Sequence, residues 1–246
     1  MVSRRALLAA ALGFGLAAPR LRAAEVEALH FSALAPGAAL PAGYRRFAFA
    51  GRARHTEYAL VEDEGRTVLR ARADASTSGI ARDLRVDLAA TPVLAWRWKA
   101  TRVPAKGDLR TKAGDDYAAR LYVAFDLPLD ALPFGERLGV EVARAIYGRD
   151  APAAALCYVW ATRAAVGTIA PNAYSSRVRM VVVESGGGAL GRWRAYERDV
   201  AADYRRAFGG APPTVKGVIV STDTDDTGET AETYYGDVSF RSRPSA

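Results

Sequence analysis

Short apolar stretches alternate with turn-forming residues along most of the chain. Segments of strand length with alternating or continuous apolar positions are residues 67–73, 79–88, 93–101, 117–125, 154–163, 177–184, 215–222 and 233–241. Turn signals such as Glu64-Gly65 and Pro212-Pro213 separate them. Many evenly spaced strands and few helices predict a mainly β protein, an antiparallel β-sandwich with a jelly-roll-like fold.

Two segments instead carry a helical spacing of apolar residues. In 134–147, Leu138, Val142 and Ile146 recur every four residues. In the second segment, Asp199 can cap a helix that ends at Phe208, just before a glycine. The pattern therefore predicts two short helices. Because no repeat or linker interrupts the strands, residues 25–246 are predicted to form a single β-sandwich domain.

The first 24 residues differ from all the rest. Arg4 and Arg5 precede an uncharged apolar run from Ala6 to Ala18. This length fits a secretory signal, which has roughly 7–15 apolar residues, and is short of the roughly 20 that span a bilayer. Ser3 and the paired arginines favour a twin-arginine export signal over a general secretory one. We therefore predict a periplasmic protein with no membrane span after signal cleavage.

Charge and cysteine content exclude several classes of protein. The formal charge is +7, but four of the 34 basic residues and none of the 27 acidic ones lie in residues 1–24, which leaves +3. Such a balanced chain without a basic cluster is not predicted to bind nucleic acid. The single Cys157 excludes an internal disulfide and lies in an apolar run typical of a core. Two histidines make a His-rich zinc site improbable.

The segment 112–125 is the most informative for chemistry. Because side chains alternate along a strand, Tyr117 and the odd-numbered residues up to Phe125 form one apolar face. Asp116, Arg120 and Tyr122 then share the other face. This row, preceded by Asp115, suits sugar recognition, in which charged groups bind hydroxyls and a ring packs on the sugar. The alternative is a cross-strand salt bridge on a solvated face.

Two tryptophans lie on one face of another predicted strand. Trp96 and Trp98 are separated by a single residue. They can either stack on a ligand or fill the core of a sandwich, the commoner fate of tryptophan in β domains. Trp160 and Trp193 carry the same two interpretations.

An acidic loop follows the strand predicted at 215–222. Asp223, Asp225 and Gly228 match the first half of a calcium loop. The twelfth position is Tyr234, where an EF-hand needs a bidentate glutamate, so an EF-hand is excluded. A looser Ca²⁺ site formed by Asp223, Asp225 and Asp226 is one interpretation. A polar turn whose side chains bind backbone N–H groups is the other. No further cofactor is predicted.

Several motifs of the sequence resemble those of one family. They are Trp96–Trp98, Lys112–Val123, Tyr158–Trp160, Pro171-Asn172, Gly191–Trp193, Asp203-Tyr204, Phe208-Gly209 and Thr222–Thr227. Together they resemble the DUF3047 family of exported bacterial proteins. The resemblance implies export and a single domain, and it implies no reaction because the function of the family is undetermined. The closing strand is also similar to that of many carbohydrate-binding jelly rolls, a fold-level analogy.

These observations lead to one main hypothesis and two alternatives. The main hypothesis is a periplasmic β-sandwich that binds a carbohydrate or another small ligand of the cell envelope. Its ligand-binding residues are Asp115, Asp116, Arg120, Tyr122, Trp96, Trp98, Asp223 and Asp225. One alternative is a glycan hydrolase or lyase that uses a carboxylate pair. The other is a structural envelope protein in which the polar rows serve only stability.

Overall fold

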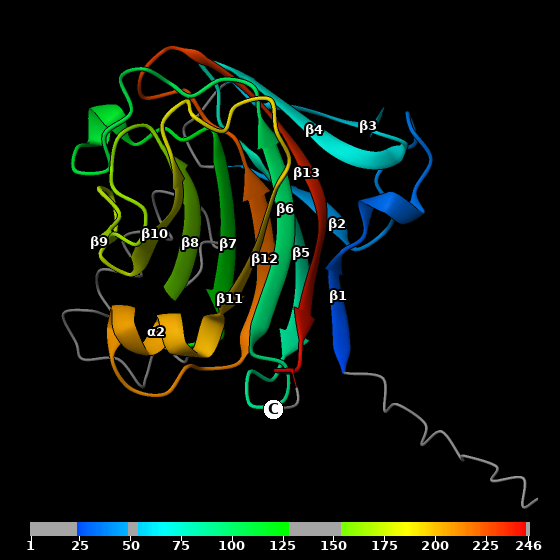
Figure 1. Cartoon of the computed structure of the whole chain (residues 1–246), viewed down its shortest axis with the longest axis vertical. Coiled ribbons are helices and arrows are strands. Elements are labelled where there is room, and N and C mark those ends of the chain that lie inside the picture. The colour runs from blue at the N-terminus through cyan, green and yellow to red at the C-terminus, as the bar shows by residue number, and fades with distance from the viewer. Residues whose placement is uncertain (1–23, 49–53, 128–153, 245–246) are drawn as a thin grey trace, which may run out of the picture.

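The computed structural model describes residues 24–48, 54–127 and 154–244, which form two β-sheets packed face to face (Figure 1). The predicted signal segment and the helix predicted at 134–147 lie outside the described residues. The structure confirms a mainly β sandwich. The jelly-roll assignment is not established by the strand order.

Sheet A has the strand order β11-β6-β13-β4-β3, and β1 pairs with β13 beside this path. The strands are β1 (Glu25–Leu29), β3 (Glu57–Asp63), β4 (Arg66–Asp74), β6 (Val93–Ala100), β11 (Arg194–Asp199) and β13 (Thr230–Arg241). Every neighbouring pair is antiparallel. The long β13 therefore runs through the centre of the sheet, between β6 and β4 (Figure 1).

Sheet B has the order β2-β5-β12-β7-β8-β10-β9. Its strands are β2 (Tyr44–Phe47), β5 (Gly79–Val86), β7 (Ala119–Phe125), β8 (Ala154–Ala161), β9 (Ile169–Pro171), β10 (Val178–Ser185) and β12 (Val215–Ser221). The pair β8–β10 is parallel. The sandwich is thus mixed rather than purely antiparallel, a correction to the predicted fold class.

All eight predicted strands are present, and the described residues form five further strands that were not predicted. The missed strands are β1, β2, β3, β9 and β11. Four of them, β2, β3, β9 and β11, form the outer edges of the two sheets. Edge strands carry charged residues that discourage pairing with other chains, as in the Arg-Ala-Tyr-Glu-Arg-Asp sequence of β11. This composition hides β2, β3 and β11 from a search for apolar alternation, and the three residues of β9 are too few to show any alternation.

One α-helix is described, α2 (Val200–Phe208), together with the 3₁₀ turns η1 (Phe31–Ala33) and η2 (Lys112–Gly114). Asp199 caps α2 as predicted, since its side chain accepts a hydrogen bond from the backbone N–H of Ala202 at 2.8 Å. Gly209 ends the helix with a φ of +76°, a conformation that glycine adopts readily. Val200 and Tyr204 pack into the core at one end of the sandwich.

The main core lies between the sheets. Its members include Leu94, Trp96, Trp98, Leu121, Val123, Phe125, Tyr158 and Trp160. The predicted apolar face of β7 is confirmed from Ala119 to Phe125, whereas Tyr117 precedes the strand and packs elsewhere. Tyr117 belongs to a second buried cluster on the opposite face of sheet B, with Tyr122, Cys157 and Met180. Burial in this cluster raises the pKa of the Cys157 thiol.

No helix among the described residues is long and apolar enough to cross a membrane.

Candidate functional site

Two loops that are far apart in the sequence meet at one end of sheet B. Strands β7 and β12 are antiparallel neighbours in which Arg120 pairs with Ser221. The residues that precede β7 therefore lie beside the residues that follow β12. This pairing brings 115–118 against the acidic loop 222–228.

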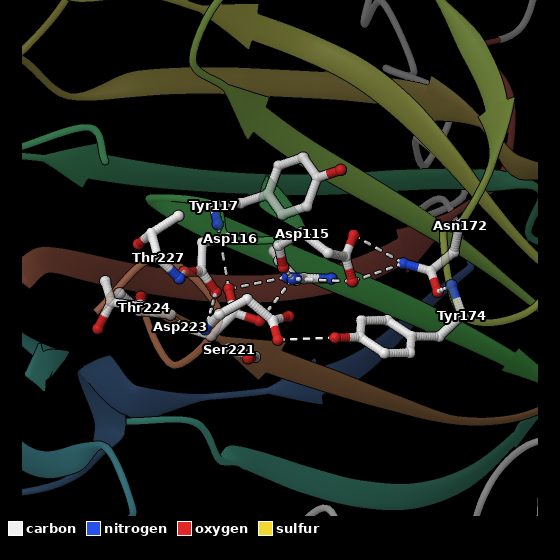
Figure 2. A network of polar contacts seen from close by, with 12 residues as sticks. Asp115, Asp116, Tyr117, Asn172, Tyr174, Ser221, Asp223, Thr224 and Thr227 are labelled. Carbon is white, nitrogen blue, oxygen red and sulfur yellow. Dashed lines mark hydrogen bonds and ion pairs between the residues drawn. The ribbon is translucent and has the colours of Figure 1, made fainter. Parts of the chain in front are cut away.

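Arg120 is the centre of this region, which Figure 2 shows from close by. Its Nε donates to Oδ1 of Asp223 at 2.9 Å, and its Nη2 lies 2.6 Å from Oδ2 of the same carboxylate. Nη1 donates to the hydroxyl of Tyr122 at 3.1 Å, and Nη2 also donates to the backbone oxygen of Asp115. The guanidinium carbon lies 4.3 Å from the ring centroid of Tyr117. With Arg120 only 2% exposed, this is a bidentate buried ion pair.

The two loops also bind each other through backbone groups. Asp116 accepts hydrogen bonds from the N–H of Thr227 at 2.6 Å and of Asp226 at 3.4 Å. In return, Asp223 accepts one from the N–H of Tyr117 at 3.2 Å. Each loop thus supplies a carboxylate that satisfies N–H groups of the other. We call the set Asp115, Asp116, Arg120 and Asp223 the buried clamp.

A third segment joins the clamp from the end of β9. The side-chain amide of Asn172 donates to both oxygens of Asp115, at 2.9 and 2.8 Å. The hydroxyl of Tyr174 donates to Oδ1 of Asp226 at 2.7 Å, so the acidic loop is tied to this segment as well (Figure 2). Asn172 was not predicted as a site residue. Its signal in the sequence was only its place in the Pro171-Asn172 family motif.

The clamp buries three carboxyl groups and one guanidinium. Among the described residues, Asp115, Asp116 and Asp223 are each at most 5% exposed, and Arg120 is the cation buried with them. Burial raises the pKa of Asp223 well above its usual range; the attraction of Arg120 opposes this rise, and Asp116 adds to it. Burial likewise raises the pKa of Asp115, and the charge of Arg120 and the hydrogen bonds from Asn172 oppose this rise. One guanidinium does not neutralise three carboxylates.

The donor set of the clamp suits a hard cation. One carboxylate oxygen each from Asp116, Asp223 and Asp225 lies within 4.8 Å of the others. Carboxylate oxygens are the ligands that Ca²⁺ prefers. The hydroxyls of Ser221 and Thr227, in the same loop region, are buried and have no hydrogen-bond partner in the part of the chain that the structure describes. The predicted metal ligands were Asp223, Asp225 and Asp226. In the structure, Asp116 lies with Asp223 and Asp225 in place of Asp226, whose carboxylate accepts a hydrogen bond from the hydroxyl of Tyr174.

The structure brings most of the predicted site residues together. Asp115, Asp116, Arg120, Tyr122, Asp223 and Asp225 lie in or beside the clamp. Both sequence interpretations placed the row Asp116–Arg120–Tyr122 at an accessible face, yet all three residues are buried. They hold the loops in place and are not free to contact a polymer.

Trp96 and Trp98 are not part of this cluster. Both lie in the main core, where Trp96 stacks on Tyr196 with ring centroids 5.2 Å apart. Trp98 packs 6.3 Å from the ring of Tyr235, whose hydroxyl accepts a hydrogen bond from the N–H of Arg120 at 3.4 Å. Trp98 is thus a core residue. It packs against Tyr235, and Tyr235 in turn binds the backbone of the strand that contains Arg120.

A second polar region lies on the outer face of sheet A. Because Trp96 and Trp98 face the core, Arg97 and Lys99 face outward. The guanidinium of Arg97 lies 4.3 Å from the ring centroid of Trp193, and the ammonium of Lys99 lies 5.0 Å from that of Tyr234. Asp63 accepts from Nζ of Lys99 at 2.6 Å and from Nε1 of Trp193 at 2.7 Å. We call these five residues the sheet A surface.

Local geometry fixes the ring of Trp193 on this surface. The side chain of Arg97 lies against Gly236 of β13, where an added Cβ would come 2.6 Å from its Cγ. Arg97 can therefore lie flat on the sheet beneath the indole. The rings of Trp193 and Tyr234 stay partly exposed. The sequence analysis named Trp96 and Trp98 as ligand-binding residues, whereas for Trp193 it left stacking on a ligand and burial in the core both open. Arg97, between the two tryptophans, and Lys99, after them, were the usable signal.

Hollows lie on both sides of the sheet A surface along β13. A groove of about 960 Å³ is lined by residues that include Arg72, Arg102 and Glu232. A smaller hollow of about 300 Å³ is lined by residues that include Arg66, Arg97 and Asp237. Because Glu232 and Asp237 flank Tyr234 in the sequence of β13, the aromatic rings lie between the two hollows.

Residues 42–239 match a family described as "Protein of unknown function (DUF3047)". The chain belongs to this family. The resemblance inferred from the motifs is thereby confirmed, and it covers most of the chain. The sequence matches no curated protein.

Two solved structures are similar in fold. The family 11 carbohydrate-binding module of the cellulosomal cellulase Lic26A-Cel5E of Clostridium thermocellum has a TM-score of 0.44 and 8% identity, covering 92% of this chain and 98% of the module. The xyloglucanase domain of NopAA, a type three effector from Sinorhizobium fredii, has a TM-score of 0.42 and 10% identity, covering 89% and 98%. With TM-scores this low, neither likeness carries an argument about function.

Proposed function

We propose that this protein is a periplasmic glycan-binding β-sandwich that binds its ligand on the sheet A surface. The observation that carries the proposal is the partly exposed ring of Trp193. It is held over Arg97 at 4.3 Å and anchored at Nε1 by Asp63. A ring that is fixed before binding loses little conformational freedom when a ligand packs on it.

The chemistry around the ring suits a sugar. A pyranose has an apolar face of C–H groups that packs on an aromatic ring and hydroxyls that need hydrogen-bond partners. Trp193 and Tyr234 offer two rings, and Arg97 and Glu232 offer charged groups beside them. Aromatic surface with a few placed polar groups is the usual composition of a small-molecule site.

The experiment is affinity electrophoresis of the mature chain through gels that contain single soluble polysaccharides. Wild-type protein is expected to be retarded by at least one of them. Trp193→Ala should bind at least tenfold more weakly, and Trp193→Phe, which keeps a ring, should be intermediate. Val166→Ala, at an exposed site away from sheet A, is the matched control. Retardation by none of the polysaccharides, or equal retardation of Trp193→Ala, contradicts the proposal.

The buried clamp has a supporting role in this proposal. Its carboxylates are engaged by Arg120 and by backbone N–H groups, which supports a role in fixing loops. The glycan hydrolase or lyase alternative needs a catalytic pair that reaches substrate. No observation on the described residues favours that pair, so we do not propose an enzyme.

Calcium is part of the proposal, with Asp116, Asp223 and Asp225 as its ligands. A divalent cation there would neutralise the excess buried negative charge. A ligand whose free concentration is 100 times its dissociation constant stabilises the folded state by about 2.7 kcal/mol. We therefore expect a higher melting temperature in CaCl₂ than in EGTA for wild type, and a smaller difference for Asp225→Asn. Equal melting temperatures for wild type in the two conditions would refute calcium binding.

Export rests on the predicted signal segment. Changing Arg4 and Arg5 to lysine should leave the protein in the cytoplasm if it uses the twin-arginine route. Cell fractionation with immunoblotting measures this, and normal export of the double variant would exclude that route.

A further inference from the structure

We infer that the glycan bound by the sheet A surface is an acidic polysaccharide, one whose sugars carry carboxylates. This inference rests on the proposed function and narrows its ligand. The observation behind it is a set of arginines on the outer face of sheet A. Among the described residues, Arg66, Arg70, Arg72 and Arg97 have no carboxylate within the 4.0 Å of an ion pair.

Cross-strand pairing places arginines beside the aromatic residue Tyr234 of β13. Across the sheet, Tyr234 pairs with Lys99 on one side and with Arg70 on the other. One step along β13, Glu232 pairs with Arg72. The partly exposed ring of Tyr234 therefore lies between Arg70 and the buried Lys99, which is paired with Asp63, so a sugar packed on the ring would meet the unpaired cation on the Arg70 side.

Other cations of this sheet are neutralised. Lys99 binds Asp63 at 2.6 Å, Arg54 binds Asp74 at 2.9 Å, and Arg241 binds Glu25 at 3.0 Å. Acidic partners are thus common on sheet A, and the four unpaired arginines are a distinct set. An arginine guanidinium presents its donors in a fork that matches a carboxylate.

Three of the four unpaired arginines line the two hollows on either side of the sheet A surface. The larger groove contains Arg72, and the smaller hollow contains Arg66 and Arg97. The smaller hollow also contains Asp237 and three glutamates, of which Glu25 and Glu197 pair with Arg241 and Glu27 lies 3.0 Å from His30. A polysaccharide that crosses Tyr234 and Trp193 from one hollow to the other would meet an unpaired guanidinium in each. A chain with a carboxylate on successive sugars provides the matching charges.

The acidic residues of the groove favour a polysaccharide over a nucleic acid. Glu57 and Glu232 line the groove together with Arg72. Their carboxylates can accept hydrogen bonds from the hydroxyls that every sugar of a polysaccharide carries, and these bonds offset their repulsion of the carboxylates of such a chain. A nucleic acid carries a phosphate at every residue and fewer hydroxyls, so it would gain less from them. A mixed surface of this kind suits a ligand that carries both carboxylates and hydroxyls.

The test compares polygalacturonate, a neutral β-glucan and a single-stranded oligonucleotide by isothermal titration with the mature chain. We expect at least tenfold tighter binding to polygalacturonate than to the glucan, and a loss of affinity as salt rises. Arg70→Gln with Arg72→Gln should weaken polygalacturonate binding about tenfold and leave the melting temperature unchanged. Arg45→Gln with Arg85→Gln, which replaces two arginines of sheet B that pair with carboxylates, is the charge-matched control.

The outcomes separate this inference from the proposed function. Equal or tighter binding of the neutral glucan overturns the acidic ligand and leaves glycan binding in place. Tighter binding of the oligonucleotide also overturns it, in favour of a different polyanion. An unchanged affinity of the double variant for polygalacturonate overturns the role of the arginines. Failure to bind either polysaccharide, in this titration and in the wider electrophoresis, overturns the proposed function itself.

Discussion

The buried clamp and the sheet A surface contain similar side chains in opposite situations. In the clamp, the Arg120 guanidinium is 2% exposed and bound by Asp223 in bidentate fashion. On sheet A, Arg97 is partly exposed, and its described contact is with the ring of Trp193. The first arginine has its donors occupied by protein groups, whereas the second retains donors for a ligand.

This difference shows why rows of charged residues are poor guides to a binding site. Asp116, Arg120 and Tyr122 attracted attention because their types suit sugar recognition. Burial changes their role, since a buried charge is tolerated only when it is paired and hydrogen-bonded. The groups that remain for a ligand are those that the fold leaves partly exposed and unpaired.

The largest expected effect is the loss of the clamp's cation. Arg120→Leu leaves the carboxylates of Asp115 and Asp223 buried without compensation, and we expect a loss of about 3–5 kcal/mol in the free energy of unfolding. Urea denaturation measures it. Replacing Arg120 and Asp223 together by leucine should recover part of the loss, because no unpaired partner of that bond remains. A loss below about 1 kcal/mol for Arg120→Leu would show that the clamp is not structural.

A pH series tests the charge excess of the clamp. The pKa of Asp115 is raised in the folded state, so its ionisation above the ordinary carboxyl pKa of about 3.9 costs stability as pH rises. The melting temperature of Asp115→Asn minus that of wild type should therefore increase from pH 4 to pH 7, measured in EGTA. Asp74→Asn, an exposed partner of Arg54, should show no such increase. If this difference in melting temperature instead decreased with pH for Asp115→Asn, the folded state would favour the ionised form of Asp115.

A glycine substitution tests the sheet A surface without touching a ring. Gly236→Ala forces Arg97 off the sheet, because the new Cβ would come 2.6 Å from its Cγ. We expect severalfold weaker glycan binding, with a change of about 1 kcal/mol or less in stability. Gly188→Ala, where an added Cβ meets no atom within 4 Å, is the control. Unchanged glycan affinity in Gly236→Ala would show that Arg97 does not position Trp193.

The smallest effect is expected at Tyr117. Its buried hydroxyl has no hydrogen-bond partner among the described residues, so Tyr117→Phe should change stability by less than about 1 kcal/mol, or increase it. Tyr122→Phe removes an acceptor of Arg120 and should cost more. Urea denaturation of both variants makes the comparison. A larger loss for Tyr117→Phe than for Tyr122→Phe would mean that Tyr117 has a polar partner after all.

Apolar periodicity alone determined the interior strands, the capped helix α2 and the burial of Cys157. These features depend on contacts that any β-sandwich core provides, so they are visible in a local pattern. The family motifs also located Asn172, although they did not give its role.

Only the tertiary structure decided which polar residues are buried. Arg120 and Tyr122 lie on the face of β7 that the alternation predicts, but a second apolar cluster on that face buries them, and Asp116 is buried in the loop before the strand. The joining of Trp193, Asp63 and Lys99 depends on strand order, which brings residues from three separate segments together. Local sequence specifies which way a side chain points; what covers that side chain is set by parts of the chain far away in sequence.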